Sequence, residues 1–248
     1  MPTLSLIVPV FNAPDLAGTL SGHLPALKTA AADAGYELIE AIFADDGSSR
    51  PLELPSTAGG VPVHVWRSTP NRGKGFVVRR AALMARGDFV LMSDVDESAP
   101  LTEFPRLAAG LNDEVWLVCG SRYKVQTEGD RADGACLSLP WHRRLLSRLF
   151  NLLVRLVGVG GISDTQCGFQ LVRMARLRPV LERLRIDRFA FDVELIAMTR
   201  RSGGAVAEIQ VSWHGGRRSS LRVARDAPRM FWDLMRIAWR TVRIPPCG

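Results

Sequence analysis

Short apolar runs alternate with amphipathic stretches along the first half of the chain, and polar turns separate them. Apolar runs of four to eight residues predict strands, whereas apolar residues spaced three or four positions apart predict helices. Strands are expected at residues 4–10, 38–44, 61–66, 88–93, 115–119, 169–172 and 205–213. Helices are expected around Leu16, Leu20, Leu24 and Leu27, which share one face, and at 76–85, at 141–157 and in two stretches before residue 205. This alternation predicts an α/β fold with a mostly parallel sheet flanked by helices.

The same pattern predicts one domain, residues 1–213, followed by a basic amphipathic extension, residues 214–248. Hydrophobic residues make up 47% of the 248 residues and charged residues 23%, which excludes both a disordered chain and a polytopic membrane protein. The four cysteines lack CxxC spacing, so neither a zinc site nor a secreted disulfide scaffold is expected. The N-terminus enters a strand without a basic leader region, which favours a cytosolic location.

The net charge of +7 is concentrated in two segments. Residues 141–162 contain four arginines and no acid, and residues 214–248 contain eight arginines against two aspartates. The remainder of the chain is therefore slightly acidic. Basic segments on such a body indicate an anionic partner, for which nucleic acid and a phospholipid headgroup layer are both candidates.

Polar clusters follow several predicted strands, where ligands bind in open α/β sheets. Asp45, Asp46 and Gly47 follow the second strand, and Asp94-Val95-Asp96 follows the fourth. Paired carboxylates suit Mg²⁺ or Mn²⁺ shared with substrate phosphates, and a carboxylate at a strand end also suits nucleoside hydroxyls. Each cluster taken singly is better explained as a solvated Asx turn.

Three further segments carry polar groups. Asn71-Arg72-Gly73-Lys74-Gly75 opens a predicted helix, where backbone amides favour a phosphate, although a glycine-rich turn with a surface lysine also fits. It is not a Walker A loop. Asp164-Thr165-Gln166-Cys167-Gly168-Phe169 follows a glycine-rich break, and Phe191-Asp192-Val193-Glu194 begins an apolar helix. Asp192 and Glu194 also fit as ordinary acids of a first helical turn.

The order of these clusters, from Val8-Pro9-Val10-Phe11-Asn12 through Gly120-Ser121-Arg122 to the two last strings, resembles the family 2 inverting glycosyltransferases with the GT-A fold. Within that family the chain looks most like the dolichyl-phosphate β-glucosyltransferases and related polyprenyl-phosphate sugar synthases. The most specific strings are residues 164–169, residues 191–195 and Trp213. The resemblance covers residues 4 to about 240.

The resemblance implies a nucleotide-sugar donor and a divalent cofactor, Mg²⁺ or Mn²⁺. It places the nucleotide-sugar near Pro9, Val10, Phe11, Asn12, Asp45, Asp46, Gly47, Lys74 and Val95, and the metal on Asp94 and Asp96. Arg122 is expected to contact a phosphate of donor or acceptor, and Asp164 with Gln166 to line the acceptor side. Asp164 is a candidate base, but an acceptor phosphate is already anionic at pH 7 and needs no strong base.

A polyprenyl-phosphate acceptor requires contact with a bilayer, yet no apolar run is long enough to span one. The extension supplies an apolar set with helical spacing and several arginines, typical of a helix in the headgroup layer: Phe231, Leu234, Met235, Ala238 and Val242. Packing on the protein's own core, or docking onto a separate small membrane protein, are alternatives. The expected location is peripheral, on the inner face of the plasma membrane.

UDP-glucose is the donor that the resemblance favours, and UDP-GalNAc, UDP-GlcNAc and GDP-mannose are alternatives. A soluble or polysaccharide acceptor is a second possibility, and a non-catalytic nucleotide-sugar-binding protein a third. The acidic strand ends do not suit a nucleic-acid partner, so none is expected.

Overall fold

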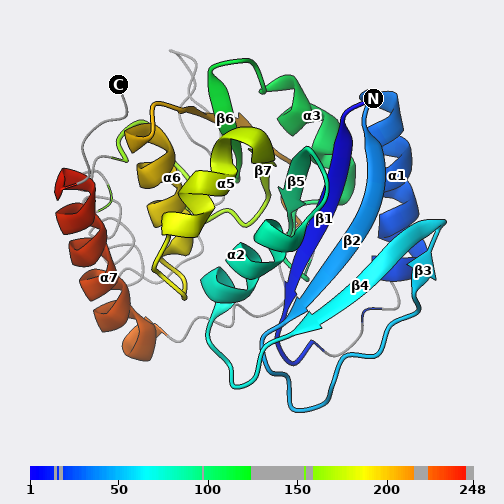
Figure 1. Ribbon diagram of the computed structural model, residues 1–248, viewed down its shortest axis with the longest axis horizontal. Coiled ribbons are helices and arrows are strands. Elements are labelled where there is room, and N and C mark those ends of the chain that lie inside the picture. The colour runs from blue at the N-terminus through cyan, green and yellow to red at the C-terminus, as the bar shows by residue number, and fades with distance from the viewer. Residues whose placement is uncertain are drawn as a thin grey trace.

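The computed structural model describes residues 1–13, 16, 19–96, 98–123, 154, 159–214 and 223–243. Their strands form one eight-stranded sheet in the order β3-β4-β2-β1-β5-β7-β6-β8 (Figure 1). The strands are β1 (Thr3–Val10), β2 (Glu37–Asp45), β3 (Thr57–Ala58), β4 (Val61–Arg67), β5 (Phe89–Met92), β6 (Val115–Ser121), β7 (Gln170–Arg173) and β8 (Ala205–Gln210). Strands β4, β2, β1 and β5 are parallel, as are β6 and β8, whereas β7 is antiparallel to both of its neighbours. The predicted mostly parallel α/β sheet is confirmed.

Helices cover both faces of this sheet (Figure 1). Because side chains alternate along a strand, β1 directs Leu4, Leu6 and Val8 into one core and Ile7 into the other. The first core lies against α1 and α3, and the second against α2, α5 and α6. The helical segments are η1 (Thr19–His23), α1 (Leu24–Asp33), α2 (Lys74–Met84), η2 (Leu101–Glu103), α3 (Phe104–Ala109), α5 (Met174–Arg183), α6 (Phe191–Arg201) and α7 (Val223–Arg243).

Two element boundaries differ from the sequence prediction. The four leucines expected on one helix face are all buried, but α1 begins only at Leu24, after a π-helical turn at Thr19–His23. Pro25 occupies the first turn of α1, where a missing amide costs no hydrogen bond. Strand β8 ends at Gln210 instead of residue 213. The Val211 amide still bonds the Ser121 carbonyl of β6, and the His214 amide then bonds the carbonyl of Ser98.

The helix predicted at 141–157 lies outside the described residues, apart from Val154, which is buried in the core. The boundary expected between residues 213 and 214 stays a prediction. None of the helices in the described part of the chain combines the length and hydrophobicity that crossing a bilayer requires.

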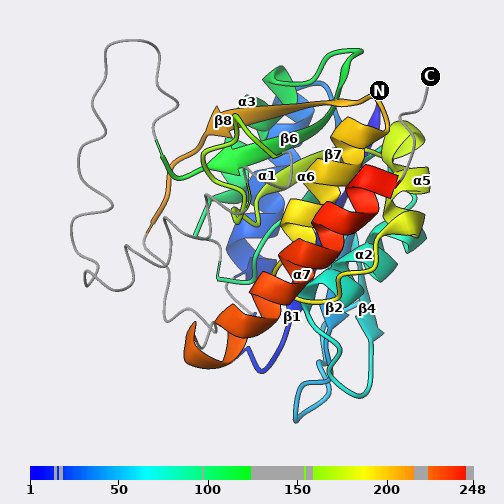
Figure 2. The ribbon, with the colours of Figure 1, turned by 90° about the vertical axis from the view of Figure 1, so that its left-hand side faces the viewer.

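Helix α7 packs along the outer side of α6 (Figure 2). Leu234 and Ile237 are buried in the core shared with α6. The Arg240 guanidinium donates to the carboxylate of Glu194 on α6, and Glu194 also accepts from the amides of Arg185 and Ile186. A buried carboxylate with these partners fixes where α7 lies.

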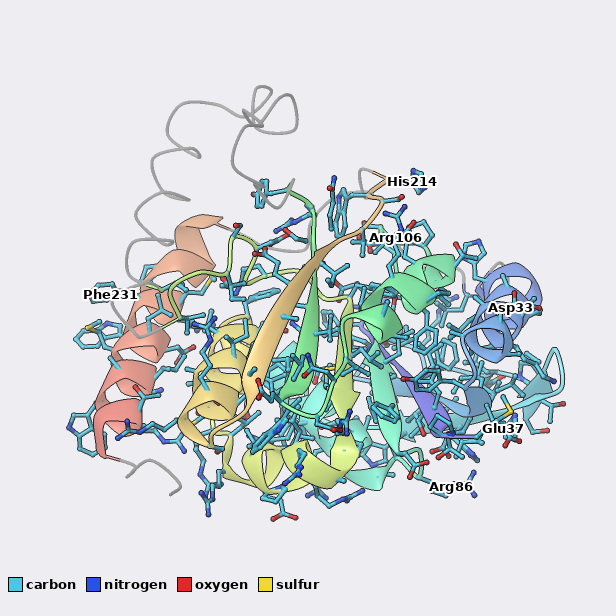
Figure 3. All side chains as sticks on the ribbon, turned by 90° about the horizontal axis from the view of Figure 1, so that it is seen from above. Asp33, Glu37, Arg86, Arg106, His214 and Phe231 are labelled. Carbon is cyan, nitrogen blue, oxygen red and sulfur yellow. The ribbon has the colours of Figure 1, made fainter. Side chains whose placement is uncertain are left out.

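The apolar face expected on α7 is divided by this packing. Leu234 and Ala238 contact the core, whereas Phe231 is 42% exposed and Trp232 65% exposed. Phe231 lies on the side of α7 that faces away from the sheet (Figure 3). Packing on the protein's own core therefore uses one part of the helix and leaves an aromatic part at the surface.

Candidate active site

The carboxyl ends of β1, β2 and β5 meet at one edge of the sheet, at the lower edge in Figure 1. Val10 pairs with Asp45, and Ile7 pairs with Met92, so the loops that follow these strands are neighbours. This arrangement brings together the polar clusters after the first, second and fourth predicted strands. It is the edge at which an open α/β sheet binds ligands.

Asp46 holds the loop that precedes α2. Its carboxylate accepts hydrogen bonds from the backbone amides of Arg72 and Gly73, each at 2.8 Å, and from Asn71 Nδ2 at 2.7 Å. Burial raises the pKa of Asp46, although the two amides stabilise its charged form. Since these bonds occupy both oxygens, the structure gives Asp46 a loop-fastening role, and its expected contact with the nucleoside stays a prediction.

Asp45 and Asn12 join the loops after β1 and β2. Asp45 Oδ1 accepts from the Ser48 amide at 2.9 Å, and Arg67 Nη1 lies 3.3 Å from Asp45 Oδ2. Asn12, at a φ of 51°, donates its amide to Ser48 Oγ and accepts from Ser49. Asp45 Oδ2 is buried, and its nearest charged partner among the described residues is the Arg67 guanidinium.

Beside this junction the first predicted string presents an aromatic ring. Phe11 is 51% exposed, while Val10 is buried and Pro9 is partly buried in β1. Gly47 adopts a φ of 76°, a left-handed conformation that glycine accepts without strain. An exposed ring next to a polar loop is suited to stacking on a planar base.

Lys74 lies at the start of α2 and contacts Asp94 of the segment Asp94-Val95-Asp96, which is called the DxD segment below. Its Nζ is 2.6 Å from Asp94 Oδ1. Burial opposes the charged form, yet the carboxylates of Asp94 and Asp192 raise the pKa of Lys74. The structure thus places a protonated lysine directly on the first carboxylate of the candidate metal site.

Gly168 leaves the space that Asp94 occupies. A side chain at Gly168 would overlap the Asp94 carboxylate, because an added Cβ would meet both of its oxygens. Two residues further on, Gln170 Nε2 donates to Asp192 Oδ1 at 3.0 Å and to the carbonyl of Cys167. The segment 164–169 and the start of α6 therefore both help to fix the position of the Asp94 side chain.

The DxD carboxylates suit a divalent cation that takes its other ligands from a substrate. Asp94 is partly buried, and Asp96 is exposed and accepts from the Ser98 amide at 3.2 Å. The described residues contain no cluster of three acidic, histidine or cysteine side chains that could hold a metal by itself. Mg²⁺ and Mn²⁺ commonly bind one or two carboxylates together with phosphate oxygens and water, so the two aspartates fit this group.

Arg122 and Asp164 form a bidentate pair beyond the DxD segment. Arg122 Nε and Nη2 each lie 2.7 Å from an Asp164 oxygen, and the Arg122 amide bonds the same carboxylate at 3.0 Å. Burial disfavours the guanidinium charge, but Asp164 raises the pKa of Arg122. Asp164 is itself held by Glu208, which accepts its amide at 2.8 Å. This carboxylate is fully engaged, and the geometry favours orientation of Arg122 over proton transfer.

Aromatic and amide groups surround that pair. The Arg122 guanidinium lies 5.2 Å from the centre of the Trp213 ring, and Trp213 lines a recess with Asp94 and Phe169. Gln166 donates its amide to Asp164 at 3.4 Å, while its side chain bonds the Thr165 carbonyl. Trp213 therefore connects the two groups, because it contacts Arg122 on one side and lines the recess with Asp94 on the other.

Asp192 is the site residue that sequence reasoning missed. It fits a first helical turn, as expected, but its side chain is buried and accepts a hydrogen bond from Gln170. Burial raises the pKa of Asp192 to about 6, against the opposing charge of Lys74. The signal in the sequence was an acid between two large apolar residues, Phe191 and Val193, where a solvated helix start is unusual.

Comparison with known proteins agrees with this geometry. The family model described as glycosyl transferase family 2 matches residues 5–178. The chain belongs to glycosyl transferase family 2. It is 30% identical over 247 residues to a dolichyl-phosphate β-glucosyltransferase of Dictyostelium discoideum, covering 96% of this chain and 74% of that protein. It is 33% identical over 185 residues to the human dolichyl-phosphate β-glucosyltransferase, covering 70% of this chain and 55% of that protein.

Solved structures share the fold of this family 2 chain. Glucosyl-3-phosphoglycerate synthase of Mycobacterium tuberculosis, crystallised with Mn²⁺, UDP and glucosyl-3-phosphoglycerate, superposes with a TM-score of 0.64 at 17% identity, over 100% of this chain and 82% of that one. A further mycobacterial protein superposes with a TM-score of 0.67 at 21% identity, over 100% and 77%. The expected GT-A-like α/β fold is thereby confirmed.

Replacing Gly168 by alanine tests the packing of Asp94. The new methyl group displaces the end of a flexible side chain, so we expect little change in the free energy of unfolding but about tenfold weaker Mn²⁺ binding. Titration calorimetry and urea unfolding measure the two quantities. Gly160→Ala is the matched control, since an added Cβ there meets open space. Equal Mn²⁺ affinity in Gly168→Ala and wild type would contradict the assignment.

Proposed function

We propose that this chain transfers glucose from UDP-glucose to the phosphate of a polyprenol and inverts the configuration at C1. The names of its relatives support the sugar and the acceptor. The observation that carries the proposal is the position of Trp213, which lines a recess with Asp94 and whose ring centre lies 5.2 Å from the Arg122 guanidinium. A carboxylate for a metal-bound diphosphate and a guanidinium for a second phosphate are what a phosphate acceptor needs.

The reaction requires positioning more than proton transfer. An oxygen of the acceptor phosphate forms a bond to C1, and the bond from C1 to the UDP oxygen breaks, with the electron pair leaving on UDP. The acceptor phosphate is already anionic at pH 7, so the engaged carboxylate of Asp164 is not needed as a base. Asp164 instead holds Arg122 in one orientation, which aligns the incoming phosphate.

The nucleotide-sugar donor would lie along the part of the sheet edge where β1, β2 and β5 end. Phe11 would stack on the nucleoside beside the loop that Asp45 holds, and Asp94 and Asp96 would hold Mg²⁺ or Mn²⁺ on the diphosphate. The metal supplies charge neutralisation for the leaving diphosphate. Lys74 would add a fixed positive charge on the same side.

We infer that the chain meets its lipid acceptor at the inner face of the plasma membrane, through the outer face of α7. Phe231 and Trp232 pack edge to face at the surface, and Trp239 is also exposed. Exposed Arg229 and Arg236 supply positive charge along the same helix. Aromatic side chains with arginines favour an anionic headgroup layer, with about 1 kcal/mol from each arginine near the surface.

A donor panel tests the reaction. Purified protein is incubated with Mg²⁺ or Mn²⁺, a short polyprenyl phosphate and one radiolabelled nucleotide-sugar at a time, and label is counted in the organic phase. We expect label from UDP-glucose, and its loss in Asp96→Ala because the leaving diphosphate then lacks half of its metal site.

The other donors, UDP-GalNAc, UDP-GlcNAc and GDP-mannose, serve as the specificity control. Organic-phase label from one of these alone would replace glucose and keep the chemistry. Label that appears only on a soluble phosphorylated acceptor would reject the polyprenol.

Vesicle sedimentation tests the membrane contact. We expect Trp232→Ser to weaken binding to phosphatidylcholine–phosphatidylglycerol vesicles about tenfold, because an interfacial aromatic ring is lost. Met84→Ser is the control, since Met84 is a half-exposed apolar residue on α2, away from α7. The contact is rejected when both variants bind as wild type does, and a separate membrane protein then becomes the favoured anchor.

A further inference from the structure

Asp192 is a buried acid near the candidate metal site. It is 5% exposed and lies in the first turn of α6. Gln170 donates to its Oδ1 at 3.0 Å, and the positive charge of Lys74 lowers the pKa of Asp192 against the effect of burial. A buried carboxylate is costly unless it is paired, so its place here requires the lysine.

Lys74 is shared between two carboxylates. Its Nζ contacts Asp94 Oδ1 at 2.6 Å, and the charge of Asp192 also favours the same ammonium and raises the pKa of Lys74. Asp192, Lys74 and Asp94 are called the charged trio below. Asp94 therefore already has a cation of the protein at Oδ1, an oxygen that a divalent metal would also use.

Gly168 and Gln170 fix the positions of the two carboxylates in the charged trio. Asp94 fits against the bare Cα of Gly168, so its carboxylate has a defined position. Gln170 uses one amide group to hold both Asp192 and the carbonyl of Cys167, which precedes Gly168. Asp94 and Asp192 are thus both held by the same short segment, which runs from Cys167 to Gln170 at the start of β7.

We propose that Lys74 and Asp192 are positioning residues that together set how strongly Asp94 binds a divalent cation. Lys74 orients Asp94 but competes with the cation for it. Asp192 draws the ammonium charge inwards and so weakens that competition. The inference rests on the proposed function only in taking Asp94 as a metal ligand.

In the charged trio, Lys74 and Asp192 have opposite effects on the affinity of Asp94 for the metal. Removing the ammonium in Lys74→Met leaves Asp94 without its competitor, so Mn²⁺ binds more tightly, by about tenfold. Removing the inner charge in Asp192→Asn leaves the ammonium with Asp94 as its main partner, so Mn²⁺ binds more weakly by a similar factor. Turnover falls in Lys74→Met although the metal is held better, because the fixed charge beside the diphosphate is lost.

The experiment measures free Mn²⁺ by electron paramagnetic resonance during titration of the full chain, with and without UDP and without any acceptor. Thermal unfolding of each variant is recorded in parallel. Lys74→Arg keeps the charge and is expected to bind Mn²⁺ within about threefold of wild type. Lys28→Met is the matched control, since Lys28 is an exposed lysine on α1 that bonds only the carbonyls of Gly59 and Gly60 among the described contacts.

Opposite shifts in folded Lys74→Met and Asp192→Asn, with Lys74→Arg and Lys28→Met near wild type, support the proposal. Shifts in the same direction, or none, overturn it, because general damage to the site would weaken binding in both variants. Absence of Mn²⁺ binding by the wild type with and without UDP also overturns it. If the opposite shifts appear but no donor labels a polyprenyl phosphate, the acceptor proposed above is wrong and this inference stands.

Discussion

Burial of carboxylates at the carboxyl edge of the sheet is the constraint on which the site depends. Asp45, Asp46, Asp164 and Asp192 are each 5% exposed or less. A carboxylate taken out of water is costly unless hydrogen bonds or a cation replace its hydration. Each of these acids therefore binds to a particular loop or side chain, and in doing so it fixes the shape of the edge.

The consequences differ for each acid. Asp46 fastens the turn that starts α2, and this places Lys74 at the edge. Asp164 takes both arms of Arg122 and so defines the direction of the guanidinium. Asp94 is left as the partly exposed member, in contact with Lys74 but open towards the recess. An edge built in this way suits the metal and phosphate contacts proposed above.

Helix α6 connects this edge to the outer surface. Asp192 faces Lys74, whereas Glu194, two residues later, holds Arg240 of α7. One helical turn therefore carries both a buried acid of the site and the anchor of the aromatic helix.

Much of the fold was predictable because buried parallel strands are continuous apolar runs, as in Leu4–Val10. The insertion of β7 antiparallel between β5 and β6 was not predictable, because strand order depends on contacts distant in sequence. The candidate residues were found at strand ends, but their partners were not. Nothing local shows that Asp46 would bind backbone amides or that Asp192 would face a lysine 118 positions earlier.

The most direct test of a metal-assisted nucleotide-sugar site at this edge is calorimetric titration of UDP with and without Mn²⁺. The account predicts that Mn²⁺ tightens UDP binding by about tenfold or more, and that this coupling disappears in Asp94→Asn. UDP affinity that is independent of Mn²⁺, or coupling that survives in Asp94→Asn, would contradict it.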